Sequence, residues 1–169
     1  LWSDSPNYQW ERFLNIASKV ADEYKKKYGI YTYFIIVCIR HLGPEKALEA
    51  SRFASTVKDK NVVGFGMAGD ETKFNTLDFM RSFDFAKQSG LGTTTHAGEI
   101  CGAKSVDEAI KLGVTRVGHG VRSCESEETI MNLSKENILL EVCPGSNIAL
   151  GLYPSLDDHP INFLLNKDL

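Results

Sequence analysis

The sequence lacks several features that define large classes of protein. No apolar run approaches the roughly 20 residues that a membrane-spanning helix requires, because the longest candidate, Tyr33–Ile39, is followed by Arg40 and His41. Basic residues are not in excess, since 19 Lys and Arg stand against 22 Asp and Glu, for a formal net charge of −3. This balance gives no reason to expect nucleic acid or an anionic membrane as a partner.

An initiator methionine is also missing. The chain begins with Leu1, and its methionines are Met67, Met80 and Met131. We therefore expect the sequence to be an internal part of a longer chain. Its 169 residues and its hydrophobic content of 43% are otherwise typical of one globular domain.

The four cysteines show no CxxC spacing, which argues against a zinc ribbon or a thioredoxin-like dithiol. Cys38 and Cys143 lie at the ends of apolar runs, so we expect both to be buried free thiols. Unpaired thiols are typical of a reducing compartment, which predicts a cytoplasmic protein.

Short apolar runs alternate with amphipathic segments along the chain. Five runs have the length and composition of strands buried in a parallel sheet: Tyr33–Ile39, Asn61–Phe65, Leu91–Thr95, Val114–Val117 and Ile138–Val142. The segments before and between them predict helices: Trp10–Lys27, Pro44–Thr56, Asn75–Gln88, a short helix opened by a capping box at Ser105–Glu108, and Glu127–Lys135. The strands begin about 23 to 30 residues apart, which is the size of one βα unit.

Five successive βα units fit either an open doubly wound sheet or part of a (β/α)₈ barrel. No GxGxxG motif follows the first predicted strand, which weakens the case for a dinucleotide-binding sheet. A complete (β/α)₈ barrel takes about 250 residues. We therefore predict an α/β fold in which residues 1–169 form an incomplete (β/α)₈ TIM barrel of about five units.

Polar residues follow every predicted strand, where parallel α/β folds place their active sites. Three of them carry the clearest chemistry: His96, Glu99 and His119. A neutral imidazole is a good ligand for zinc, and a nearby carboxylate can act as an acid or base. The alternative is that each is a hydrogen-bonded structural residue. His41 could also line this rim, but an ion-paired or capping role explains it equally well. His159 stands at a loop-to-helix junction, and we give it little weight as a site residue.

Four motifs carry a resemblance to a known family: MAGDE (67–71), THAGE (95–99), GHG (118–120) and CPGSN (143–147). In this order and at this spacing they resemble the adenosine deaminase family of the amidohydrolase superfamily. The resemblance extends from about Tyr33 to the end of the chain. It implies a (β/α)₈ barrel with one Zn²⁺ at its C-terminal rim.

The resemblance also implies a role for each motif. His96 resembles a zinc ligand, and Glu99 the proton donor to purine N1. His119 resembles the base or electrostatic anchor for the attacking water. Gly69 resembles the glycine whose backbone N–H meets purine N3. The CPGSN segment is expected to shape the pocket.

Some of the family's pattern is absent. No HxH pair is present, and Asp157-Asp158 is followed by His159 rather than by the proline of the family's final Asp-Asp-Pro segment. One of four expected zinc ligands is therefore present. Gly66-Met67 stands where many members have Asp-Leu. We expect missing barrel strands, or a complementing chain, to complete the site.

The implied function is zinc-dependent hydrolytic deamination of adenosine or 2′-deoxyadenosine to the 6-oxopurine nucleoside and ammonia, in purine salvage. An alternative is a deaminase of adenine or another 6-aminopurine. An alternative of another class is a catalytically silent fragment that acts as a binding module. A cytidine-type deaminase is almost excluded, because H-x-E and P-C-x-x-C do not occur.

Overall fold

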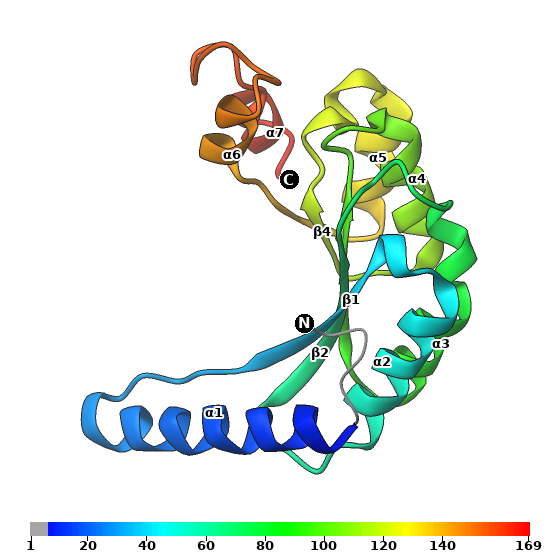
Figure 1. The fold of residues 1–169 in the computed structure, drawn as a ribbon. Coiled ribbons are helices and arrows are strands. Elements are labelled where there is room, and N and C mark those ends of the chain that lie inside the picture. Colours follow the sequence, from blue (N-terminus) through cyan, green and yellow to red (C-terminus); the bar gives the residue numbers. More distant parts are fainter. Residues whose placement is uncertain (1–6) are drawn as a thin grey trace.

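The computed structural model describes residues 7–169, which form a curved parallel sheet with helices on one face (Figure 1). The five strands lie in sequential order: β1 (Phe34–Ile39), β2 (Val62–Ala68), β3 (Gly92–Ala97), β4 (Arg116–His119) and β5 (Leu139–Glu141). The helices are α1 (Asn7–Tyr28), α2 (Pro44–Thr56), α3 (Met80–Gln88), α4 (Gly102–Leu112), α5 (Glu127–Lys135), α6 (Pro144–Ala149) and α7 (Ile161–Leu165).

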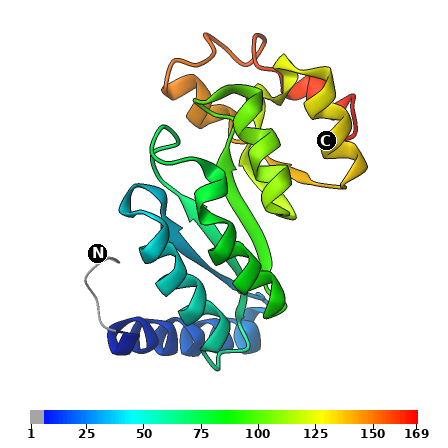
Figure 2. The ribbon, with the colours of Figure 1, turned by 90° about the vertical axis from the view of Figure 1, so that its right-hand side faces the viewer.

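Helices α2 to α5 lie side by side on the convex face of the sheet (Figures 1 and 2). Each connects one strand to the next, so every adjacent pair of strands is parallel. A curved parallel sheet with sequential strands and helices on one side is an incomplete (β/α)₈ barrel, as the sequence predicted. Within residues 7–169, β1 and β5 each pair with one neighbour, which leaves both outer edges of the sheet unpaired.

The core lies between the sheet and this helix layer. Alternate residues of the strands point toward the helices, for example Phe65 and Met67 in β2 and Val117 in β4, and all three are buried. Phe65 packs edge-on against Phe83 of α3, with ring centroids 5.2 Å apart. Burying one phenylalanine contributes about 1.5–3 kcal/mol, so this layer stabilises the sheet that holds the site.

The concave face carries polar groups below the C-terminal edge. Glu141 of β5 accepts a hydrogen bond from the Thr94 hydroxyl at 2.9 Å and pairs with Arg116 at 3.0 Å. Side chains of alternate strand positions fill the interior of a barrel. This polar layer therefore occupies the position of the barrel interior, directly below His96 and Gly118.

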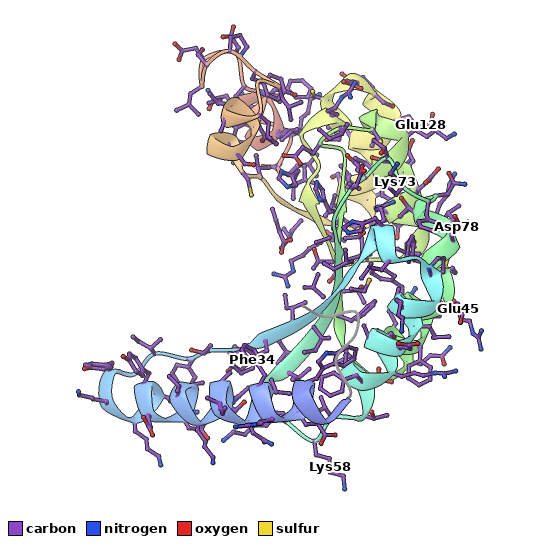
Figure 3. All side chains as sticks on the ribbon, in the orientation of Figure 1. Phe34, Glu45, Lys58, Lys73, Asp78 and Glu128 are labelled. Carbon is purple, nitrogen blue, oxygen red and sulfur yellow. The ribbon has the colours of Figure 1, made fainter. Side chains whose placement is uncertain are left out.

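Helix α1 extends away from the sheet (Figure 1), and Phe34 lies in the angle between the sheet and this helix (Figure 3). The predicted helix Trp10–Lys27 is confirmed, but its apolar residues Phe13, Ile16, Val20 and Tyr24 are largely exposed. Among the side chains of α1 whose burial the structure describes, residues 10–28, Leu14 and Ala21 are buried on another face of the helix.

Two local predictions were wrong. Helix α4 begins at Gly102, one turn before the predicted capping box, so Ser105 lies inside the helix rather than at its start. Its hydroxyl donates to the carboxylate of Glu71, 34 residues earlier, a contact that local spacing cannot reveal. Cys143 is exposed, because it follows the short strand β5 at the rim, whereas Cys38 is buried as predicted.

The predicted cap at Asn75 is present. Asn75 and Asp78 form a reciprocal capping box, although the first turn is a 3₁₀ turn and α3 proper begins at Met80. No helix among the described residues is long and apolar enough to cross a membrane.

Candidate active site

Three polar side chains meet at the C-terminal edge of the sheet. The register places His96 of β3 opposite Gly118 and Ala97 opposite His119, the last residue of β4. Because Thr95 and Ala97 face the helices, His96 points to the concave side. Glu99 follows β3 by two residues. The sequence predicted this convergence from the shared position of these residues at strand ends.

The geometry of the cluster is close. Glu99 Oε2 lies 3.0 Å from His96 Nε2, and Glu99 Oε1 lies 3.2 Å from His119 Nδ1. The two imidazole rings lie with their centroids 4.5 Å apart. One carboxylate therefore bridges two imidazoles at the rim.

The backbone at His119 supports this arrangement. His119 has φ of +66°, a left-handed conformation that is costly for a residue with a Cβ. Gly120 follows with φ of +65°, and its N–H donates to the carbonyl of Ala97 at 2.9 Å. A side chain at position 120 would meet Leu140. The sharp turn that aims His119 at Glu99 thus requires glycine next to it.

Burial controls the charge of His119. It lowers the pKa of His119 below its ordinary value, the Glu99 carboxylate opposes this effect, and neighbouring His96 reinforces it. The ring is therefore neutral at pH 7, which is the form that can accept a proton or bind a metal.

His96, Glu99 and His119 could hold a metal ion. One donor atom from each side chain can be chosen such that all three lie within 4.8 Å of one another. Imidazole nitrogen and carboxylate oxygen are ligands that Zn²⁺ accepts, and catalytic zinc sites use three protein ligands. The donor set therefore fits a divalent transition metal, with His96 on the most exposed side of the cluster.

Glu71, whose role could not be predicted from the sequence, holds the loop that carries Glu99. Its buried carboxylate accepts hydrogen bonds from four consecutive backbone N–H groups, of residues 98–101, and from the hydroxyl of Ser105. Burial by itself would raise the pKa of Glu71, but these hydrogen bonds outweigh it and hold the pKa below its usual range. The MAGDE motif contained this residue, yet nothing in it indicated the partner.

Arg40 supports His96 in a similar way. Its buried guanidinium donates to the carbonyl oxygen of His96 at 3.0 Å and to the hydroxyl of Thr76 at 3.3 Å. Arg40 follows β1 in the sequence, and its side chain is buried beneath the end of β3. Arg40 thus fixes the backbone of one candidate ligand.

Asn147 links the CPGSN segment to the cluster. Its side-chain NH₂ donates to Glu99 Oε1 at 3.0 Å and lies 3.4 Å from His119 Nδ1. His159 Nε2 lies 3.1 Å from Asn147 Oδ1. His159, given little weight from the sequence, therefore contacts the cluster through Asn147.

Gly69 lies at the same edge, toward β1. With φ of +106° it adopts a conformation that favours glycine, and an added Cβ would lie 3.1 Å from His41 Nδ1. His41 is exposed in the turn that follows β1. The position of Gly69 at the rim agrees with a ligand-facing backbone, and its contact with a purine remains a prediction.

Comparison with known proteins gives the family. A family model described as adenosine deaminase matches residues 5–169. The adenine deaminase of Agrobacterium fabrum is 45% identical over 141 residues, which cover 83% of this chain and 43% of that protein. The chain thus spans less than half the length of this curated relative.

Solved structures agree. The adenine deaminase from Arthrobacter aurescens superposes with a TM-score of 0.81 at 29% identity, covering 88% of this chain and 46% of that one. The N6-mAMP deaminase of Arabidopsis superposes with a TM-score of 0.74 at 27% identity, covering 82% and 41%. With a family model that matches nearly the whole chain and a rim cluster built from its motifs, this chain belongs to the adenosine deaminase family.

Proposed function

We propose that the full-length protein carrying this chain catalyses metal-dependent hydrolytic deamination of a 6-aminopurine, and that adenine is its substrate. The reaction consumes one water and releases hypoxanthine and ammonia. The observation that carries the proposal is the meeting of His96, Glu99 and His119 at the rim of an incomplete barrel. The names of the relatives favour adenine over the adenosine expected from the motifs alone.

In this reaction His96 would be one ligand of a zinc ion, as the family resemblance implies. Such an ion, when bound, lowers the pKa of a coordinated water toward about 7. Glu99 gives a proton to ring N1 as water attacks C6, as the family resemblance implies, and its carboxyl group lies between the two imidazoles at the rim. Neutral His119 accepts a proton from the attacking water and returns it to the amino group at C6, which leaves as ammonia. The proton of the new C6 hydroxyl then goes back to Glu99. Gly69 offers its backbone N–H to N3 of the base.

The remaining ligands and the barrel closure would come from chain outside residues 1–169 or from a complementing chain. The open edges of β1 and β5 support this, because an unpaired strand edge at each end of a curved sheet is what a missing set of strands would cover. The four thiols, none of which forms a disulfide, agree with a cytoplasmic location.

The test is a substrate panel with the full-length protein. Adenine, adenosine, AMP and N6-methyl-AMP are offered side by side. The release of ammonia, or of methylamine from N6-methyl-AMP, is measured together with the loss of absorbance at about 265 nm. We expect turnover of adenine and loss of turnover in Glu99→Gln with bound metal retained. A metal-loaded protein that turns over none of the four would contradict the proposal and favour the catalytically silent binding module.

A further inference from the structure

A chain of hydrogen bonds runs from the start of α7 to the cluster. The backbone N–H of Ile161 donates to His159 Nδ1 at 3.1 Å. His159 Nε2 lies 3.1 Å from Asn147 Oδ1, and Asn147 Nδ2 lies 3.0 Å from Glu99 Oε1. Asn147 is fully buried, and His159 is 3% exposed. Water therefore has little access to these groups and could not easily replace any of these hydrogen bonds if one were broken.

The direction of the chain follows from its first link. A backbone N–H can only donate, so His159 Nδ1 must accept, and the proton of a neutral ring must lie on Nε2. Nε2–H then donates to Asn147 Oδ1, which turns the NH₂ of Asn147 toward Glu99. Burial lowers the pKa of His159 and keeps the ring neutral, in agreement with this order.

The reversed order is excluded by the same groups. With the amide of Asn147 turned over, its NH₂ would face Nε2, which would have to become an acceptor. The ring proton would then lie on Nδ1, against the N–H of Ile161. The amide oxygen of Asn147 would also face Glu99 Oε1, so two hydrogen-bond acceptors would lie against each other with no proton between them. The hydrogen bonds from Ile161 N–H to His159 and from Asn147 to Glu99 would both be lost. Because these groups are buried, water could not replace the lost hydrogen bonds, as it does when an amide on the surface rotates.

We propose that His159 is a positioning residue: it fixes the amide of Asn147, and through it the orientation of the Glu99 carboxylate. Oε1 is held as an acceptor by Asn147, so the plane of the carboxylate is set and Oε2 is directed toward His96. This inference rests on the proposed function, because it assigns His159 and Asn147 to the acid-base group of that reaction. His159 itself touches neither substrate nor metal.

The central test is His159→Phe in the full-length enzyme. Phenylalanine keeps a planar ring against Tyr153, whose centroid lies 4.8 Å from that of His159, but it cannot donate to Asn147. We expect kcat to fall about 10- to 100-fold, as for a misplaced catalytic group, with KM and zinc content nearly unchanged. His159→Gln, whose amide can accept from Ile161 and donate to Asn147, should recover much of the loss.

Two further variants separate positioning from packing. If His159 acts through Asn147, then adding His159→Phe to Asn147→Ala should lower kcat little beyond Asn147→Ala alone. Leu164→Ala removes buried packing from α7, the helix that follows His159, without touching the hydrogen bonds. It should lower thermal stability while the folded enzyme keeps a kcat close to that of the wild type. If His159→Phe does not fold, Asn147→Asp keeps the acceptor for His159 and removes the donor to Glu99. It should lower kcat in the same range, and an unchanged kcat would overturn the inference.

The outcomes are distinct. An unchanged kcat in folded His159→Phe, or additive losses in the double variant, would overturn the inference and leave the deaminase proposal standing. If the wild type deaminates no aminopurine, the proposed function fails, and ¹⁵N NMR of the His159 ring still decides the hydrogen-bond order. A neutral ring protonated at Nε2 supports the order, and a ring protonated at Nδ1 or at both nitrogens refutes it.

Discussion

The carboxylate of Glu71 gives the sharpest stability prediction. It collects the N–H groups of four consecutive residues, 98–101, and the hydroxyl of Ser105. We predict that Glu71→Gln in the full-length protein destabilises the fold and misplaces Glu99. The two oxygens accept different numbers of hydrogen bonds. Oε2 accepts from the N–H groups of Glu99, Ile100 and Cys101, and Oε1 accepts from Gly98 N–H and the Ser105 hydroxyl.

The magnitude follows from this division. A glutamine can place its carbonyl oxygen at the Oε2 position and keep three of the five hydrogen bonds. The NH₂ of the glutamine then faces the buried N–H of Gly98, which loses its charged acceptor. The hydroxyl of Ser105 can rotate and accept a hydrogen bond from the same NH₂. A lost hydrogen bond to a charged group costs about 1.5–3 kcal/mol. We therefore expect a loss of about 2–3 kcal/mol for Glu71→Gln, and more for Glu71→Ala, which leaves all four N–H groups without this carboxylate.

The assay is chemical denaturation beside steady-state kinetics. The matched control is Glu45→Gln, an exposed residue on the outer side of α2 (Figure 3) that makes the same chemical change away from the site. We expect the control to change stability by less than about 0.5 kcal/mol. Glu71→Gln should also lower kcat about 10- to 100-fold, because the loop carrying Glu99 shifts. Equal stabilities and equal kcat values for the two variants would refute the role of Glu71.

Three further outcomes are expected. His96→Ala should remove bound zinc as well as activity, measured by elemental analysis, and a fully metallated variant would show that the ligand is misassigned. Gly98→Ala should cost about 2–4 kcal/mol, because Gly98 has φ of +69° and a Cβ would collide with Val106; Gly145→Ala, where a Cβ meets open space, is the control, and equal melting temperatures would contradict the reasoning. Because the folded pKa of Glu71 lies below its usual range, its stabilising effect is present above about pH 4.3 and is lost as pH falls through the folded pKa. Acid denaturation should therefore cost the wild type more than Glu71→Gln, and parallel pH–stability curves would oppose this.

Part of the site could be predicted because parallel strands have a simple geometry. Their C-terminal ends meet at one edge, so residues just past two consecutive strands must be neighbours. That rule predicts that His96, Glu99 and His119 lie close together, and their chemistry and motifs single them out among the polar residues at the strand ends. The five βα units follow from apolar runs at regular spacing. The boundaries shifted by a few residues, and α4 began a turn early, because Ser105 bonds to a distant carboxylate instead of capping its own helix.

The supporting residues could not be predicted, because their partners lie far along the chain. Glu71 meets the loop at residues 98–101, Arg40 meets the carbonyl of His96, and Asn147 meets Glu99 48 residues away. The hydrophobic pattern of the sequence does not reveal such a pair, because a Glu or Asn residue looks the same in the sequence whether its side chain is solvated or buried. The exposure of Cys143 could not be predicted for the same reason, because it depends on how few other parts of the fold pack over the end of β5.

The sequence by itself thus determined the fold class, the order of the strands and the three groups that meet at their ends, since local hydrophobic patterns and the rules of parallel sheets act over short distances. Only the tertiary structure decided which buried groups orient them. Glu71 became an acceptor for a loop, Arg40 a donor beneath a strand, and His159 the first side chain of a directed hydrogen-bond chain. Each of these roles depends on burial and on a partner brought close by folding, and desolvation then makes one hydrogen-bond arrangement far more stable than its alternatives.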